Sequence, residues 1–114
     1  MKNDIRTHEG ALEKCVKHPE NIGWDKRDML AIISEVRLFK KDNTNQDKEC
    51  DIIALYDEPH NYSRLAEFKS DKAYPSIKAY NQLINTGRRF CDRIGYPAEE
   101  MIVVYYPSMR IETI

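Results

Sequence analysis

The sequence predicts a single α/β domain, a mixed β-sheet flanked by helices, with the element order α-β-β-β-α-β. Two stretches space their apolar residues as helices do, and four short stretches are apolar or alternate in the manner of strands. The first three strands follow one another through short connections, and a long helical stretch separates the third strand from the fourth. A length of 114 residues, 41% of them apolar, suits one domain over 1–114 with a modest core.

The first helix is expected over residues 5–18. Leu12, Cys15 and Val16 recur there at helical spacing, with Ile5 further upstream. Pro19 should end this helix, because a residue that precedes proline is disfavoured in the helical conformation. The connection that follows is expected to contain a helical turn near 25–30.

Three neighbouring strands are expected at 32–40, 50–57 and 64–70. The first is rich in β-branched and aromatic residues, and the third alternates apolar with charged residues. The second is a nearly continuous apolar run, which indicates that both of its faces are covered. The polar stretch 42–49 predicts a hairpin loop, so the three strands should form an antiparallel meander.

The longest helix is expected over 75–94. Pro75 suits its first turn, and one apolar stripe runs along it. The members of this stripe are Ile77, Tyr80, Ile84, Gly87, Cys91 and Ile94. A crossover of this length permits the fourth strand, 101–107, to pair in parallel with the third. The last residues are expected to form a short edge strand.

Composition and charge limit the class of protein. A net charge of −1 does not favour a protein whose whole surface binds nucleic acid, although a local basic patch remains compatible with it. The three cysteines form no CxxC or zinc pattern, so reduced thiols in a cytoplasmic protein are expected. The polar stretch 1–10 lacks the apolar core expected of a signal peptide. No apolar stretch approaches the roughly twenty residues that span a bilayer, so no membrane association is expected.

An acidic site is predicted on the second and third strands. Side chains alternate across a strand, so Glu67 and Lys69 share one face. If the two strands pair, Asp51 approaches Glu67, and two adjacent carboxylates repel unless a cation lies between them. Oxygen ligands favour Mg²⁺ or Mn²⁺, and such an ion can activate water for attack on a phosphodiester. Lys69 would then orient that water or stabilise charge on the phosphate.

The pattern formed by Asp51, Glu67 and Lys69 resembles the motif of the PD-(D/E)xK nuclease superfamily, which includes restriction endonucleases and archaeal junction resolvases. Further stretches, among them "SEVRLF", "CDIIALYD" and "LAEFKS", are similar to the C-terminal catalytic domain of archaeal and actinobacterial structure- and mismatch-specific endonucleases. The similarity covers roughly residues 8–106. It implies a restriction endonuclease-like αβββαβ core and a Mg²⁺- or Mn²⁺-dependent deoxyribonuclease.

The resemblance also implies roles for further residues. A glutamate on the first helix joins the metal site in such domains, and Glu9 is the first match here and Glu13 the second. Gln82 matches a glutamine that lies beside the metal on the later helix. The sequence departs from the superfamily pattern at Cys50, which stands where a proline commonly precedes the aspartate.

Alternatives remain open from the sequence. The polar face of the long helix, with Lys78, Arg88 and Arg89 on or near it, is either a solvated surface or a phosphate-binding one. His8, His18 and His60 have no ligand spacing and are expected to be surface residues. The chain is either a nuclease or a non-catalytic nucleic-acid-binding or assembly subunit of the same fold, with a soluble interaction domain as the third hypothesis. A nuclease this small would need a homodimer or a partner subunit to enclose a duplex.

Overall fold

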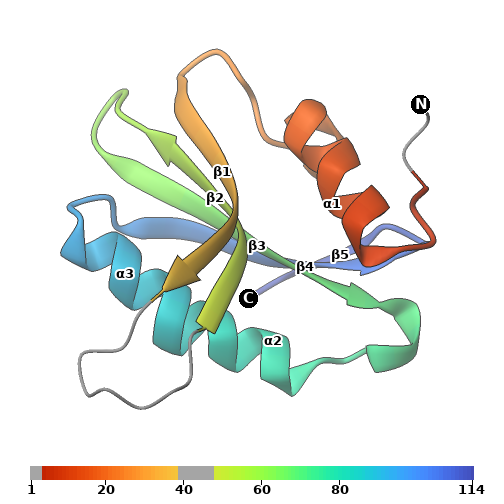
Figure 1. Cartoon of the computed structure of the whole chain (residues 1–114). Helices are drawn as coiled ribbons and strands as arrows, with labels where there is room; N and C mark the ends of the chain where they lie inside the picture. The colour runs from red at the N-terminus through yellow and green to blue at the C-terminus, as the bar shows by residue number, and fades with distance from the viewer. Residues whose placement is uncertain (1–3, 39–47) are drawn as a thin grey trace.

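The computed structural model describes residues 4–38 and 48–114. A β-sheet forms the centre, with one helix on one face and a long helix on the other (Figure 1). The predicted α/β class and α-β-β-β-α-β order are confirmed, whereas the predicted loop at 42–49 lies largely outside the described residues. The elements are α1 (His8–Lys17), η1 (Pro19–Ile22), β1 (Met29–Leu38), β2 (Lys48–Tyr56), β3 (Tyr62–Ser70), η2 (Asp71–Ala73), α2 (Ile77–Gln82), the π-helical η3 (Leu83–Gly87), α3 (Arg88–Arg93), β4 (Ala98–Tyr106) and β5 (Arg110–Thr113).

The five strands lie in the order β1-β2-β3-β4-β5. The β1–β2, β2–β3 and β4–β5 pairs are antiparallel, and β3 and β4 are parallel, as the crossover helix predicts. Ile52 pairs with Ala66, and Ala66 pairs with Ile102, so the apolar centre of three strands lies in one row. This register fixes which side chains of β2 and β3 face each other.

The α1 helix covers one face of the sheet. The Thr7 side chain accepts a hydrogen bond from the Gly10 N–H and so caps the helix, which begins at His8 rather than at residue 5. Leu12 and Cys15 are buried in a cluster with Phe68 of β3. The helical turn expected near 25–30 is instead the 3₁₀ turn η1 at Pro19–Ile22, because Pro19 starts a short helix as readily as it ends one.

The long helix covers the opposite face as one continuous run of α2, η3 and α3 (Figure 1). Its buried stripe advances in steps of four residues through Ala79, Leu83, Gly87 and Cys91. Four residues overshoot one turn of an α-helix, so such a stripe would drift around the helix. The π-helical η3, with its wider turn, keeps these residues toward the sheet.

The predicted apolar stripe of this helix is wrong at both ends. Ile77 is 68% exposed and Ile94 is 42% exposed. Three of the four sheet-facing residues are small, Ala79, Gly87 and Cys91, and small residues let the helix backbone approach the strands closely. A Cβ atom on Gly87 would lie 2.4 Å from Leu65 Cδ2, which shows how close this approach is.

Replacing Gly10 by alanine is expected to destabilise the protein, by about 1–3 kcal/mol. An added Cβ would lie 1.9 Å from the backbone oxygen of Asp4, and a backbone atom cannot move aside as a side-chain end can. Urea unfolding of wild type and Gly10→Ala measures the loss. The neighbouring exposed position serves as the control, since Glu9→Ala should change stability by under about 0.5 kcal/mol. Equal midpoints for both variants would contradict this packing.

Cys15, Cys50 and Cys91 are all buried free thiols. Burial raises the pKa of each, that of Cys15 to about 11. A nucleophilic cysteine needs a lowered pKa, so none of the three has the environment of a reactive thiolate. Within residues 4–38 and 48–114, the structure contains no helix with the length and apolar character needed to cross a membrane.

Candidate active site

Asp51 and Glu67 meet where the pairing of β2 with β3 ends. The register of the two strands stops at Ile52 and Ala66. One residue further on, the Asp51 N–H donates to Glu67 Oε1 (3.1 Å), and two residues beyond Ala66 the Phe68 N–H donates to Asp51 Oδ2 (2.8 Å). Each carboxyl group thus satisfies a backbone donor of the other strand. The structure brings the two acids together, as a β2–β3 hairpin predicts.

The two carboxyl groups are buried and perturb each other. Asp51 is 6% exposed and Glu67 is 2% exposed. Burial, and then the charge of the neighbouring Asp51 carboxylate, raise the pKa of Glu67 from 4.5 to about 8. At neutral pH Glu67 therefore retains a proton, which it shares by hydrogen bond with Asp51.

His8 is the α1 residue that reaches this pair. Its Nε2 atom lies 3.1 Å from Asp51 Oδ2, and its side chain is 41% exposed. The ring lies edge-on against Phe68 and Tyr106, with centroid distances of 6.4 and 6.0 Å. The hydrogen bond to Asp51 raises the pKa of His8 above 6.5, against the opposite effect of burial.

The prediction that His8 is a surface residue holds only in part, because its half-exposed side chain is also hydrogen-bonded to the buried Asp51. His8 lies three residues before Ala11 and four before Leu12, so all three share the sheet-facing side of α1. Counting back along the apolar stripe would have placed His8 on this side of α1, but would not have predicted its contact with Asp51. His18 and His60 are exposed as expected, and their ion pairs with Glu20 and Glu99 lie away from the two acids.

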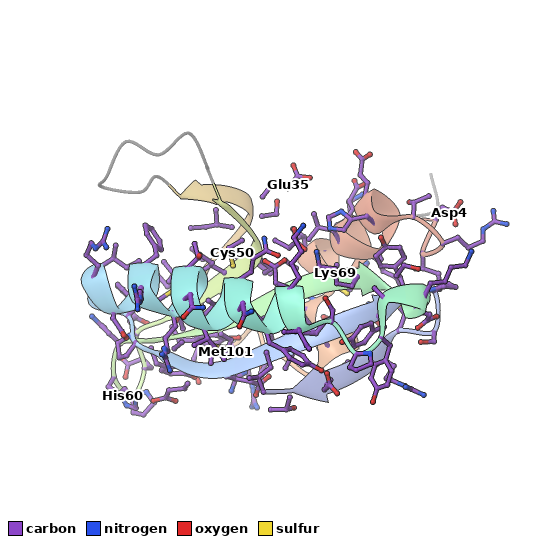
Figure 2. The ribbon with its side chains drawn as sticks, turned by 90° about the horizontal axis from the view of Figure 1, so that it is seen from below. Asp4, Glu35, Cys50, His60, Lys69 and Met101 are labelled. Atoms are coloured by element: carbon purple, nitrogen blue, oxygen red, sulfur yellow. The ribbon has the colours of Figure 1, made fainter. Side chains whose placement is uncertain are left out.

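Lys69 is half-buried and follows Glu67 by two residues on β3, so both side chains start from the same face of the strand. Figure 2 shows Lys69 at the end of the sheet where α1 and α2 approach β3. The largest effects raise both pKa values: burial raises that of Glu67, and the Asp51 hydrogen bond raises that of His8. The positive charge of Lys69 acts in the opposite direction and lowers the pKa of both groups. Lys69 therefore acts electrostatically on the site.

The two predicted glutamates of α1 lie apart from the acidic pair. Glu9 and Glu13 are both exposed, and Glu13 forms an ion pair with Lys17 (Oε1–Nζ 3.1 Å). Because the three residues succeed one another at steps of four, they run along the outer face of α1. The structure does not bring either glutamate to Asp51.

The remaining predicted residues lie on the long helix. Gln82 ends α2, is half-buried, and has a buried side-chain oxygen. Lys78, Arg88 and Arg89 are all exposed along the same helix. Their accessibility suits either a solvated face or contacts with phosphates, so their role in binding stays a prediction.

The donor set of the pair suits a hard divalent cation. In the part of the chain that the structure describes, no group of three or more His, Cys, Asp or Glu side chains is arranged to hold a metal. Asp51 and Glu67 still supply oxygen donors, and proteins commonly hold Mg²⁺ through one or two carboxylates with water completing the shell. The raised pKa of Glu67 fits this role, because a cation would displace its proton.

Comparison of the chain with protein-family models, with curated proteins and with solved structures gives no match. The function must therefore be inferred from the geometry of the site and from the motif itself.

Proposed function

We propose that this chain is a nuclease that depends on a divalent metal and hydrolyses phosphodiester bonds, with DNA as its substrate. The observation that supports the proposal best is that two buried acids on neighbouring strands, Asp51 and Glu67, meet, with the Asp51 N–H donating to Glu67 Oε1. Lys69 follows at the spacing of the motif. The α-β-β-β-α-β order agrees with a restriction endonuclease-like core, which is the fold that we propose.

Each residue of the site has a proposed role. Asp51 and Glu67 would hold Mg²⁺ or Mn²⁺, and the bound ion would polarise a phosphate oxygen and lower the pKa of a water. The Lys69 ammonium group would orient the attacking water and stabilise charge that develops on the phosphate. Gln82 would position the water. Burial strengthens these interactions, because charges interact more strongly where bulk water is excluded.

The exposed basic residues of the long helix would contact the DNA backbone. Lys78, Arg88 and Arg89 provide positive charge without any base-specific geometry, so they would position the duplex rather than read its sequence. A domain of this size offers one such face. We therefore propose that a second copy or a partner subunit completes the enclosure of a duplex.

Replacing Lys69 by alanine is expected to preserve Mn²⁺ affinity and to reduce DNA cleavage about 10²–10³-fold, since the lysine acts on the transition state and not as a ligand. Calorimetric Mn²⁺ titration and plasmid cleavage measure the two quantities separately. Lys72→Ala is the matched control, because Lys72 is an exposed lysine just beyond β3. Cleavage by Lys69→Ala at the wild-type rate would remove the proposed role of the lysine.

The same assays separate a nuclease from a non-catalytic subunit of the same fold. A nuclease cleaves plasmid or branched DNA when Mn²⁺ is added and stops when the metal is chelated. A wild-type chain that binds DNA but leaves every such substrate intact would favour the non-catalytic subunit.

A further inference from the structure

We infer that β5 is a dimerisation edge and that it pairs in antiparallel fashion with the β5 strand of a second copy of this chain. The two-fold axis would pass beside Ile111, so that the five strands of each copy join into one continuous sheet. The pairing needs neither metal nor DNA and so goes beyond the proposed function. Only the use of the dimer, which is to enclose a duplex, rests on the proposed function.

The first observation is the open edge of β5. It is the last strand of the sheet, and in the part of the chain that the structure describes only β4 pairs with it (Figure 1). The Ile114 N–H donates to the Met101 carbonyl (3.0 Å), and in an antiparallel pair the backbone groups of alternate residues point the same way. Those of Ile111 and Thr113 therefore point away from β4, toward the open edge.

The opposite edge of the sheet is less suited to such pairing. β1 forms that edge, and its pairing with β2 shifts register between Met29 and Ala31. Glu35 of the same strand has a φ of 53°, which lies in the left-handed region. Irregularities of this kind twist an edge and keep it from pairing with another chain. β5, by contrast, keeps an unbroken register with β4 from Arg110 to Thr113.

The second observation is that the side chains of β5 are complementary to those of a second β5. Arg110 and Glu112 lie on one face of the strand and Ile111 lies on the other. In an antiparallel pair centred on Ile111, the two isoleucines lie opposite each other. Arg110 of each copy then lies opposite Glu112 of the other, at the non-hydrogen-bonded positions where opposite side chains are closest. A pair centred on Glu112 would instead place two glutamates opposite each other.

Both charged side chains are already held by neighbouring tyrosines. The guanidinium carbon of Arg110 lies 4.5 Å from the centroid of the Tyr74 ring, and a guanidinium stacked in this way keeps its N–H donors directed outward in its own plane. The hydroxyls of Tyr80 and Tyr105 both donate to Glu112 Oε1, so Oε2 can accept from an arginine. Side chains that are ordered before association lose less entropy when the two copies pair.

The third observation is the apolar surface beside this edge. Ile111 is 42% exposed and Tyr74 is 45% exposed. Ile77, which is also exposed, precedes Tyr80 by three residues and therefore lies on the side of α2 that contacts β5. A second copy paired along β5 would cover apolar surface at this edge, and its burial would stabilise the dimer.

Sedimentation equilibrium in the presence of a chelator, without DNA, tests whether the dimer forms. Wild type is expected to have twice the monomer mass of 13.4 kDa at micromolar concentrations. Arg110→Glu places like charges opposite each other twice and should raise the dissociation constant about 100-fold or more. Arg93→Glu, the same charge reversal at the exposed end of α3, should leave the dimer intact. A monomeric wild type, or an Arg110→Glu variant that dimerises as wild type does, would overturn the inference.

Oxidative cross-linking tests the register. Ile111→Cys should form an intermolecular disulfide, because residues directly opposite each other have Cα atoms about 5.5 Å apart. The three native cysteines are buried and do not compete. Thr113→Cys is the exposed control, since the same pairing separates the two copies of this position by about 13 Å or more. Equal cross-linking at both positions, or none at position 111, would contradict the pairing.

These results are distinct from those that test the proposed function. A monomer that cleaves DNA would overturn the pairing of β5 and leave the nuclease standing. A dimer that cross-links at position 111 but neither binds Mn²⁺ nor cleaves DNA would confirm the pairing and overturn the nuclease.

Discussion

Asp51→Asn is expected to reduce Mn²⁺-dependent DNA cleavage by about 10³-fold or more, which corresponds to roughly 4 kcal/mol of barrier. The substitution removes the negative charge that lies against both Glu67 and His8. An amide oxygen at this position can still accept the Phe68 N–H hydrogen bond, so the fold should persist. The loss would then belong to the chemistry of the site and not to unfolding.

Plasmid cleavage with Mn²⁺ measures the rate, and circular dichroism checks the fold of the variant. Asp57→Asn provides the matched control, because Asp57 is an exposed aspartate directly after β2. That variant should cleave as wild type does. If Asp51→Asn retains wild-type activity while correctly folded, Asp51 has no part in the reaction.

Glu67→Gln is expected to abolish cleavage as well, yet to make the metal-free protein more stable at pH 8, by on the order of 4 kcal/mol. Ionising Glu67 in the folded state is unfavourable, since burial and the neighbouring Asp51 carboxylate raise its pKa to about 8. A glutamine can accept the Asp51 N–H bond with its oxygen and donate to the Asp51 carboxylate with its amide. The substitution thus keeps the hydrogen bonds and removes the cost of ionisation.

The pH dependence of this gain follows from the direction of the shift. The folded state binds the Glu67 proton more tightly than the unfolded state, whose pKa is 4.5. The contribution of Glu67 to wild-type stability is therefore fully present below about pH 4.5 and is lost as the pH rises through about 8. His8 acts in the same direction, because the Asp51 hydrogen bond also raises its pKa in the folded state. The contribution of His8 to stability is lost as the pH rises through the pKa of folded-state His8.

Urea unfolding at pH 4, 6 and 8 in the presence of a chelator tests this expectation. Glu67→Gln should match wild type at pH 4 and exceed it progressively at pH 6 and 8. Glu58→Gln, at an exposed position in the turn after β2, should follow wild type at every pH. A gain that is the same at all three pH values would show that ionisation of Glu67 is not its cause.

The sequence allows the core of this site to be predicted because its geometry is local. Asp51 and Glu67 belong to consecutive strands, and the short connection at 57–61 fixes the register between them. Because side chains alternate along β3, Lys69 lies on the same face of the strand as Glu67. The parallel pairing of β3 with β4 follows in the same way from the length of the helix between them.

Interactions between α1 and the sheet could not be predicted with the same certainty, because they depend on how a helix is rotated about its axis. The contact of His8 with Asp51 joins residues 43 positions apart, and no spacing rule links them. The predicted stripe of the long helix is right at Gly87 and Cys91 and wrong at its ends, since bulky Ile77 and Ile94 are exposed. Ala79, which the predicted stripe leaves out, is buried. Backbone packing favoured small residues over large apolar ones there.

A crystal structure of the protein soaked in Mn²⁺, with anomalous data, tests the account most directly. The account predicts an anomalous peak within bonding distance of carboxylate oxygens of both Asp51 and Glu67. Peaks only elsewhere, or no peak at millimolar Mn²⁺ with both side chains still hydrogen-bonded as in the metal-free protein, would contradict the proposed metal site and the nuclease activity that depends on it.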